Sequence, residues 1–149
     1  QHKLADEEYY EKRKIADVKT DMNFSGKHIL LAEDNDLNAE IAIALLEEEG
    51  LLVERAADGV KCMEMLEKAP AHFYDLILMD IQMPILGGYD TTRKIRRMAD
   101  AEKAAIPIIA MTANAFAEDK QRALAAGMND HVAKPIDMNK LIPTLQKYI

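Results

Sequence analysis

The sequence predicts a doubly wound α/β fold with a five-stranded parallel sheet in the order 2-1-3-4-5. From Lys27 onward, short apolar runs alternate with amphipathic stretches, which is the pattern of repeated strand and helix units, and five such units fit. Right-handed crossovers allow the first strand to lie beside the third, with the second strand outside it. The length of 149 residues suits one domain with one core.

The first unit begins with the apolar strand His28–Ala32, and a helix over about residues 37–49 follows it. Gly50 is the stop signal of this helix. One face of the helix is apolar and is expected to be buried; it comprises Ile41, Ala42, Leu45 and Leu46.

The second unit begins with a strand over residues 51–56. Glu54 and Arg55 make this strand more polar than the others, which favours an edge position. Asp58 is of the type that caps helices, and it predicts a helix that runs to about Ala69.

The third unit begins at residues 76–79, which are apolar throughout. A central parallel strand is buried on both faces and has this composition, so we expect the segment in the middle of the sheet, ending at Asp80. A loop with Pro84 and two glycines then leads to a helix over about residues 89–98.

The last two units have strands at residues 106–111 and 131–133 and helices at about 116–126 and 138–148. Pro143 lies inside the last helix and removes one of its hydrogen bonds, so a kink or a later start is expected there.

Residues 1–24 differ from the rest because they are rich in charge and contain no Gly or Pro. They predict a charged helical linker, and residues 25–149 predict the folded domain. The net charge of -7 argues against direct nucleic-acid binding, since phosphate backbones are held by clustered Lys and Arg. The single Cys62 excludes an internal disulfide, and no apolar run reaches the roughly 18 residues of a membrane span. A cytoplasmic location without membrane contact is the expectation.

Acidic side chains follow two strands that are expected to be neighbours. Glu33 and Asp34 come directly after the first strand, and Asp80 comes directly after the third. Ligands of open parallel sheets bind beyond the carboxyl ends of the strands, where the strand order reverses. Three carboxylates in such a cleft repel one another unless a cation neutralises them. Mg²⁺ prefers such oxygen ligands, so the sequence predicts a magnesium site.

Two further polar residues come directly after the fourth and fifth strands, namely Thr112 and Lys134. A hydroxyl and an ammonium group beside a metal-bound carboxylate suit a transferred phosphoryl group, because its catalysis is mostly positioning and charge neutralisation. Pro135 follows Lys134, and a cis peptide bond between them is expected.

The motifs LLAEDNDLN, LILMDIQMP, IIAMTANAF and HVAKPI, in this order and spacing, resemble the receiver domain of two-component response regulators over residues 27–149. The EDN and DHVAKP segments are more similar to those of receivers in hybrid histidine kinases than to those of free-standing chemotaxis-type receivers. The resemblance implies a flavodoxin-like (βα)5 fold. It also implies a phospho-acceptor in a phosphorelay, with self-catalysed phosphorylation and autodephosphorylation, rather than an enzyme acting on free substrates.

Residue by residue, the resemblance implies that Asp80 is the phosphorylated aspartate and that Thr112 and Lys134 are the switch hydroxyl and the phosphoryl-binding lysine. The implied metal ligands are Asp34, Asp80, the backbone carbonyl of Gln82 and, through a water, Glu33. His131 occupies the place of an aromatic switch residue, and Gly87 the place of an acidic residue, so both depart from the family pattern. Gln82 and Asn114 flank the phosphoryl site and are expected to tune its lifetime.

The implied partner is a histidine kinase or a histidine phosphotransfer domain, and a homodimer through the fourth helix, fifth strand and fifth helix of the fold is a further possibility. Two other functions stay open. A docking module with a vestigial site needs none of this chemistry, and a phosphatase of the haloacid dehalogenase type needs a second acid where this chain has Gln82. A flavodoxin-like cofactor binder would need a phosphate-cradling glycine loop, and the mouth of this fold is acidic instead.

Overall fold

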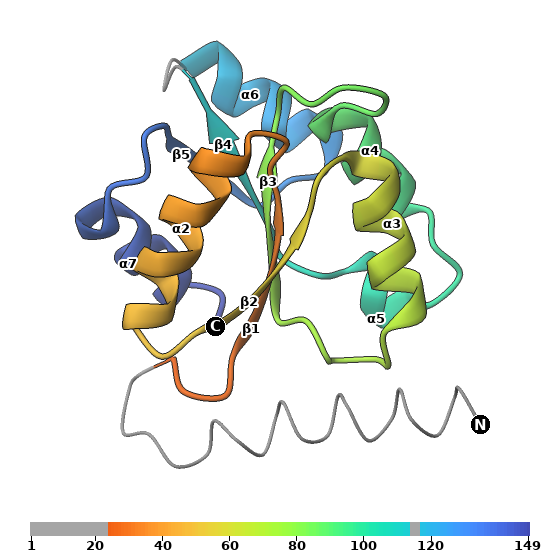
Figure 1. Cartoon of the computed structure of the whole chain (residues 1–149). Helices are drawn as coiled ribbons and strands as arrows, with labels where there is room; N and C mark the ends of the chain where they lie inside the picture. Colours follow the sequence, from red (N-terminus) through yellow and green to blue (C-terminus); the bar gives the residue numbers. More distant parts are fainter. Residues whose placement is uncertain (1–23, 114–116) are drawn as a thin grey trace.

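The computed structural model describes residues 24–113 and 117–149, and these residues form a parallel sheet flanked by helices (Figure 1). The sheet has five strands in the order β2-β1-β3-β4-β5, as predicted. The strands are β1 (His28–Ala32), β2 (Leu52–Ala56), β3 (Leu76–Asp80), β4 (Ile108–Thr112) and β5 (Asp130–Ala133).

Helices connect the strands and cover both faces of the sheet (Figure 1). They are α2 (Asp36–Glu48), α3 (Gly59–Lys68), α4 (Gly88–Arg96), α5 (Ala101–Ala104), α6 (Ala117–Ala126) and α7 (Met138–Gln146). The side chains of Asn35, Asp58 and Asp137 cap α2, α3 and α7, and of these three caps the sequence predicted Asp58.

The core has two layers, one on each face of the sheet. On one face, α2 and α7 pack their buried side chains, Leu46 and Leu141 among them, against Ile29 and Leu78 of the central strands. On the other face, α3, α4 and α6 pack against the alternate residues of the same strands. Every residue of β1, β3 and β4 is buried, because each of these strands is covered from both sides.

The parallel register brings the carboxyl ends of the strands together at one edge of the sheet. Ala32 pairs with Met79, Asp80 with Met111, and Thr112 with Ala133. The residues that end or follow these strands are therefore neighbours, although up to about a hundred positions separate them along the chain.

The structure corrects several predicted boundaries by one or two residues. Asp80 and Thr112 are the last residues of β3 and β4 rather than the first residues of loops, and the short helix α5 was not predicted. The last helix begins at Met138, so of the two expected effects of Pro143 the later start does not occur, and the kink stays a prediction. The Asp137 cap and the burial of Leu141 and Leu145 hold this helix on both sides of the proline.

Ile41 was expected in the core, yet 51% of it is exposed. The buried face of α2 is instead formed by Ala39, Ala42 and Leu46, one row further around the helix. The predicted N-terminal linker lies outside the described residues, apart from the buried Phe24 at its end. Among the residues that the structure describes, no helix is long and apolar enough to cross a membrane.

Candidate functional site

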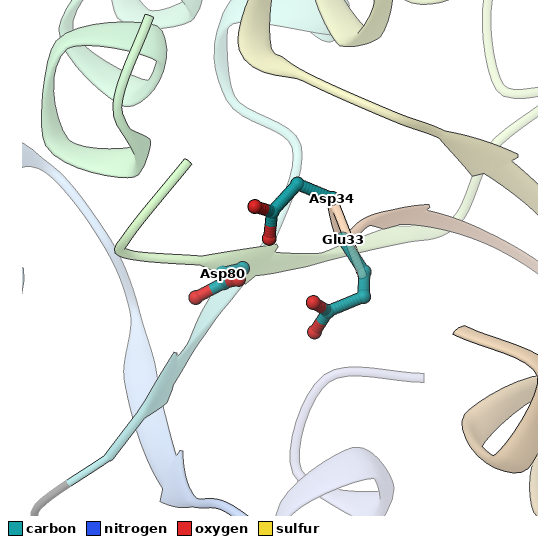
Figure 2. Close-up of side chains that lie close together, drawn as sticks. All are labelled: Glu33, Asp34 and Asp80. Atoms are coloured by element: carbon teal, nitrogen blue, oxygen red, sulfur yellow. The ribbon is translucent and has the colours of Figure 1, made fainter. Parts of the chain in front are cut away.

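Three carboxylates meet at the carboxyl ends of β1 and β3. Glu33 and Asp34 follow β1, and Asp80 ends β3, so the pairing of the two strands brings them together (Figure 2). One carboxylate oxygen of each residue lies within 4.8 Å of the other two. Glu33 and Asp80 are buried, whereas Asp34 is exposed. This geometry matches the predicted acidic cluster and leaves one side of it accessible.

Lys134 joins this cluster from the loop that follows β5. Its Nζ lies 2.9 Å from Oδ2 of Asp80 and 3.1 Å from Oε2 of Glu33. The backbone amide of Lys134 donates to the carbonyl of Thr112, which keeps the loop beside β4, and the Lys134–Pro135 peptide bond is cis, as predicted. One ammonium group is thus shared by two buried carboxylates.

The pKa of Asp80 reflects opposing influences. Burial raises it, because a carboxylate loses its hydration, while the hydrogen bonds from Lys134 and from the amide of Gln82 lower it, and the charge of Glu33 raises it. The outcome is a pKa of about 6, above the ordinary value of 3.8. For Lys134, burial lowers the pKa, but the hydrogen bonds and charges of Asp80 and Glu33 outweigh burial and raise it above the ordinary value.

A small cleft of about 80 Å³ opens beside Asp80. Thr112, Gln82 and Lys134 line it, and the amide of Gln82 donates to Oδ1 of Asp80 at 3.0 Å. Asp119, from the first turns of α6, also lines the cleft. The cleft is large enough for a small tetrahedral group, and the buried Asp80 borders it.

Of the predicted tuning residues, Gln82 alone lines the cleft among the residues that the structure describes. His131 is on β5 and does not line this cleft; its Nδ1 lies 3.8 Å from Oδ1 of Asp130. Asn114 lies outside the described residues. Their predicted roles therefore stay predictions.

Sequence reasoning missed two residues of this region. Arg55 had been noted only for making β2 polar, yet it bonds to the loop that carries Glu33 and Asp34. Asp119 carried no signal, because a single acid near a helix start is common. Only the packing of β2 against β1, and of α6 over β4, shows that these two side chains border the site.

The comparisons with known proteins agree with this architecture. The sequence profile of the response regulator receiver domain matches residues 29–146. The chain belongs to the receiver domain family. Curated relatives of the domain include hybrid signal transduction histidine kinase I of Dictyostelium discoideum, 40% identical over 81% of this chain, and histidine protein kinase 1 of Candida albicans, 43% identical over 80%. The chain spans only 7% and 5% of the length of these two proteins.

Solved structures show the same receiver fold. The receiver domain of a sensor histidine kinase from Pseudomonas aeruginosa, with a magnesium ion coordinated in its active-site cleft, is 41% identical, with a TM-score of 0.72 over 82% of this chain and 96% of that one. The receiver domain of Ssk1 from Saccharomyces cerevisiae, crystallised with the histidine phosphotransfer protein Ypd1, is 26% identical, with a TM-score of 0.71 over 82% and 88% of the two chains. This receiver domain is therefore similar to ones that hold magnesium and that bind a phosphotransfer protein.

Proposed function

We propose that this receiver domain accepts a phosphoryl group on Asp80 and passes the signal on through a change in its surface. The observation that carries the proposal is the contact of Lys134 with both Asp80 and Glu33, beside the carboxylate of Asp34. A solvated acidic rim would not hold a lysine between two buried carboxylates, because burying three charges is costly unless each has a partner.

The donor set fits Mg²⁺. Carboxylate oxygens that lie within 4.8 Å of one another suit a hard, oxygen-preferring cation. Asp34 and Asp80 would bind the ion directly, the backbone carbonyl of Gln82 would add a third ligand, and Glu33 would act through a water. When bound, Mg²⁺ neutralises charge on the phosphoryl oxygens.

In the proposed reaction, an oxygen of the Asp80 carboxylate forms a bond to phosphorus while the bond from phosphorus to the donor nitrogen of a phosphohistidine breaks. The electron pair of the broken bond stays on the imidazole, which then takes a proton, and Asp80 becomes an acyl phosphate. Lys134 lies where its ammonium can pair with a phosphoryl oxygen. Asp80 needs no base for this step, since the carboxylate itself is the nucleophile.

The switch would follow from the added charge. A phosphoryl group brings about -1.5 to -2 charges in place of one, and the hydroxyl of Thr112 is the neighbouring donor that can turn toward it. Movement of Thr112 would be passed to the face formed by α6, β5 and α7, which includes His131, and this face is also the candidate surface for a homodimer. Gln82 and Asn114 would set the lifetime of the acyl phosphate.

The expected donor is a histidine kinase or a histidine phosphotransfer domain, in the cytoplasm. The surface beside the site suits such a partner, because an apolar cavity of about 330 Å³ between α2 and the loop after β5 shares Glu33 and Lys134 with the site. Ile41 lines this cavity, and Leu37, one turn earlier on α2, is 64% exposed. The exposure of Ile41, which is unexpected for a core residue, is explained if a partner helix covers it. The similarity to receiver domains of hybrid histidine kinases supports the further proposal that this domain is part of a hybrid sensor kinase.

Mass spectrometry of the intact protein tests the proposal. Incubation with acetyl phosphate and Mg²⁺ is expected to add one phosphoryl group to the parent and none to Asp80→Asn. The variant is expected to fold, because the pKa of Asp80 shows that its charge is disfavoured by burial. A parent that gains no phosphoryl group would leave the docking module as the better account. Steady release of phosphate from ester substrates would instead favour the phosphatase.

A further inference from the structure

Arg55 on β2 bonds to the loop that carries the acidic cluster. Its Nε donates to the carbonyl of Glu33 at 2.9 Å, and its Nη2 donates to the carbonyl of Asp34 at 3.0 Å. Its Nη1 lies 2.6 Å from Oδ1 of Asp36, the first residue of α2. A single guanidinium therefore holds two consecutive carbonyls and the start of the next helix.

The segment between β1 and α2 has few other anchors. The amide of Glu33 extends the sheet by donating to Ala56, the amide of Asn35 donates to Oε1 of Glu33, and the Asn35 side chain caps α2. Asp34 between them is exposed. Bonds to the carbonyls of Glu33 and Asp34 restrict the peptide planes on both sides of Asp34. Because a guanidinium is a rigid planar fork, it fixes the spacing of two acceptors, which a lysine cannot do.

The charge of Arg55 and its hydrogen bonds have opposite effects on the affinity of the site for a cation. A positive charge beside a cation site weakens the binding of that cation. Here Asp36 pairs with the guanidinium, so the pair as a whole adds little charge to the site. The positional effect is therefore expected to exceed the electrostatic one.

We propose that Arg55 is a positioning residue for the magnesium site, which keeps the carboxylates of Glu33 and Asp34 directed toward Asp80 by holding their backbone. The inference rests on the proposed function, because it concerns the affinity of the same site. The inference predicts the direction of the change in Mg²⁺ affinity: loss of the positive charge of Arg55 should weaken the binding of the cation, whereas a purely electrostatic effect would strengthen it.

Calorimetric titration of the metal-free protein with MgCl₂ tests the inference. Arg55→Met is expected to raise the dissociation constant about tenfold, the usual size of effect for residues that orient metal ligands. Arg55→Lys is expected to lie between Arg55→Met and the parent, because one ammonium can bond to only one of the two carbonyls at a time. The matched control is Arg93→Met, which removes the same charge from an exposed arginine on α4 and should leave the dissociation constant within about twofold of the parent.

A second readout separates positioning from general damage to the fold. If Arg55 acts on the metal site alone, phosphorylation of Arg55→Met by acetyl phosphate approaches the parental rate once MgCl₂ is saturating. A reduced rate at saturation would contradict the inference, and so would unchanged or tighter Mg²⁺ binding in Arg55→Met. If Arg55→Met does not fold, Arg55→Lys provides the test. A lysine cannot bond to both carbonyls at once, so a Mg²⁺ affinity equal to that of the parent in this variant would contradict the inference. A parent that binds no Mg²⁺ would overturn the proposed function itself.

Discussion

Asp80 combines burial with access from one side. It is 2% exposed, it is bonded to Lys134 and to the amide of Gln82, and it borders a cleft. The hydrogen bonds hold its two oxygens in fixed directions, while burial raises its pKa to about 6. A carboxylate poised in this way is easily neutralised, either by a proton or by a cation.

The raised pKa of Asp80 predicts a pH dependence of Mg²⁺ affinity. Below about pH 6, protons compete with Mg²⁺ for the Asp80 carboxylate, so the dissociation constant for Mg²⁺ should rise about tenfold for each unit by which the pH falls. Above about pH 7 the dissociation constant should no longer depend on the protonation of Asp80. Titrations with MgCl₂ at a series of pH values measure this curve.

Lys134→Met serves as the comparison for this curve. Removing the ammonium takes away an influence that lowers the pKa of Asp80. The pH below which Mg²⁺ affinity begins to fall should therefore be higher in this variant than in the parent. The prediction would be contradicted if Mg²⁺ affinity of the parent began to fall only near about pH 4, the pKa of an ordinary aspartate.

The start of α4 shows how one helix depends on a single glycine. The amide of Gly88 donates to the carbonyl of Ile81, and a Cβ at Gly88 would lie 2.4 Å from the carbonyl oxygen of Asp80. Helix α4 can therefore approach the end of β3 only without a side chain at this position. At Gly87, one residue earlier, a Cβ would meet only the carbonyl of Ile81, at 3.5 Å, and φ is -71°.

The two glycines predict opposite outcomes for the same substitution. Gly88→Ala should lower the free energy of unfolding by about 1 to 3 kcal/mol, because backbone must move to admit the new methyl group. Gly87→Ala should leave it unchanged or raise it by up to about 1 kcal/mol, since the backbone there suits any residue. Urea unfolding of both variants makes the comparison, and equal losses would contradict it.

The whole molecule is predicted to become more stable when Mg²⁺ binds. Three carboxylates lie together in the metal-free protein and only two of them contact Lys134, in a chain whose net charge is already -7. A ligand that binds only the folded state stabilises it, by about 2.7 kcal/mol at a concentration of about a hundred times its dissociation constant. Urea unfolding in MgCl₂ and in EDTA measures this difference.

Asp34→Asn provides the control for the metal effect. Asp34 is exposed, and its side chain accepts no hydrogen bond from residues 24–113 or 117–149, so the variant should fold as the parent does in EDTA. It should lose most of the gain in MgCl₂, because a proposed direct ligand of the ion is weakened. Identical unfolding of the parent with and without Mg²⁺ would contradict a metal site of useful affinity.

Asp80 also predicts how the stability of the metal-free protein changes with pH. Its pKa in the folded protein lies above the ordinary value of 3.8, so the folded protein binds this proton more tightly than the unfolded chain does. The contribution of Asp80 to stability is therefore greatest at low pH and is lost as pH rises from about 4 through about 6. This loss is the stability cost of keeping an ionised carboxylate in a buried site.

The sequence by itself determined the strand order, the two-sided burial of the central strands and the set of residues at the strand ends. These features follow from short-range patterns: apolar runs mark buried strands, helix signals mark their connections, and the register of a parallel sheet brings the strand ends together. Asp34, Asp80 and Lys134 could be placed beside one another because each follows or ends such a strand.

The tertiary structure alone decided which side chains face one another across elements. It placed Arg55 against the acidic loop, left Ile41 exposed beside the site, and set the pKa of Asp80 through burial and Lys134. Periodicity defines the faces of a helix or strand only to within a row of residues, and both hydrogen bonds across strands and the loss of hydration depend on atoms brought together from distant parts of the chain.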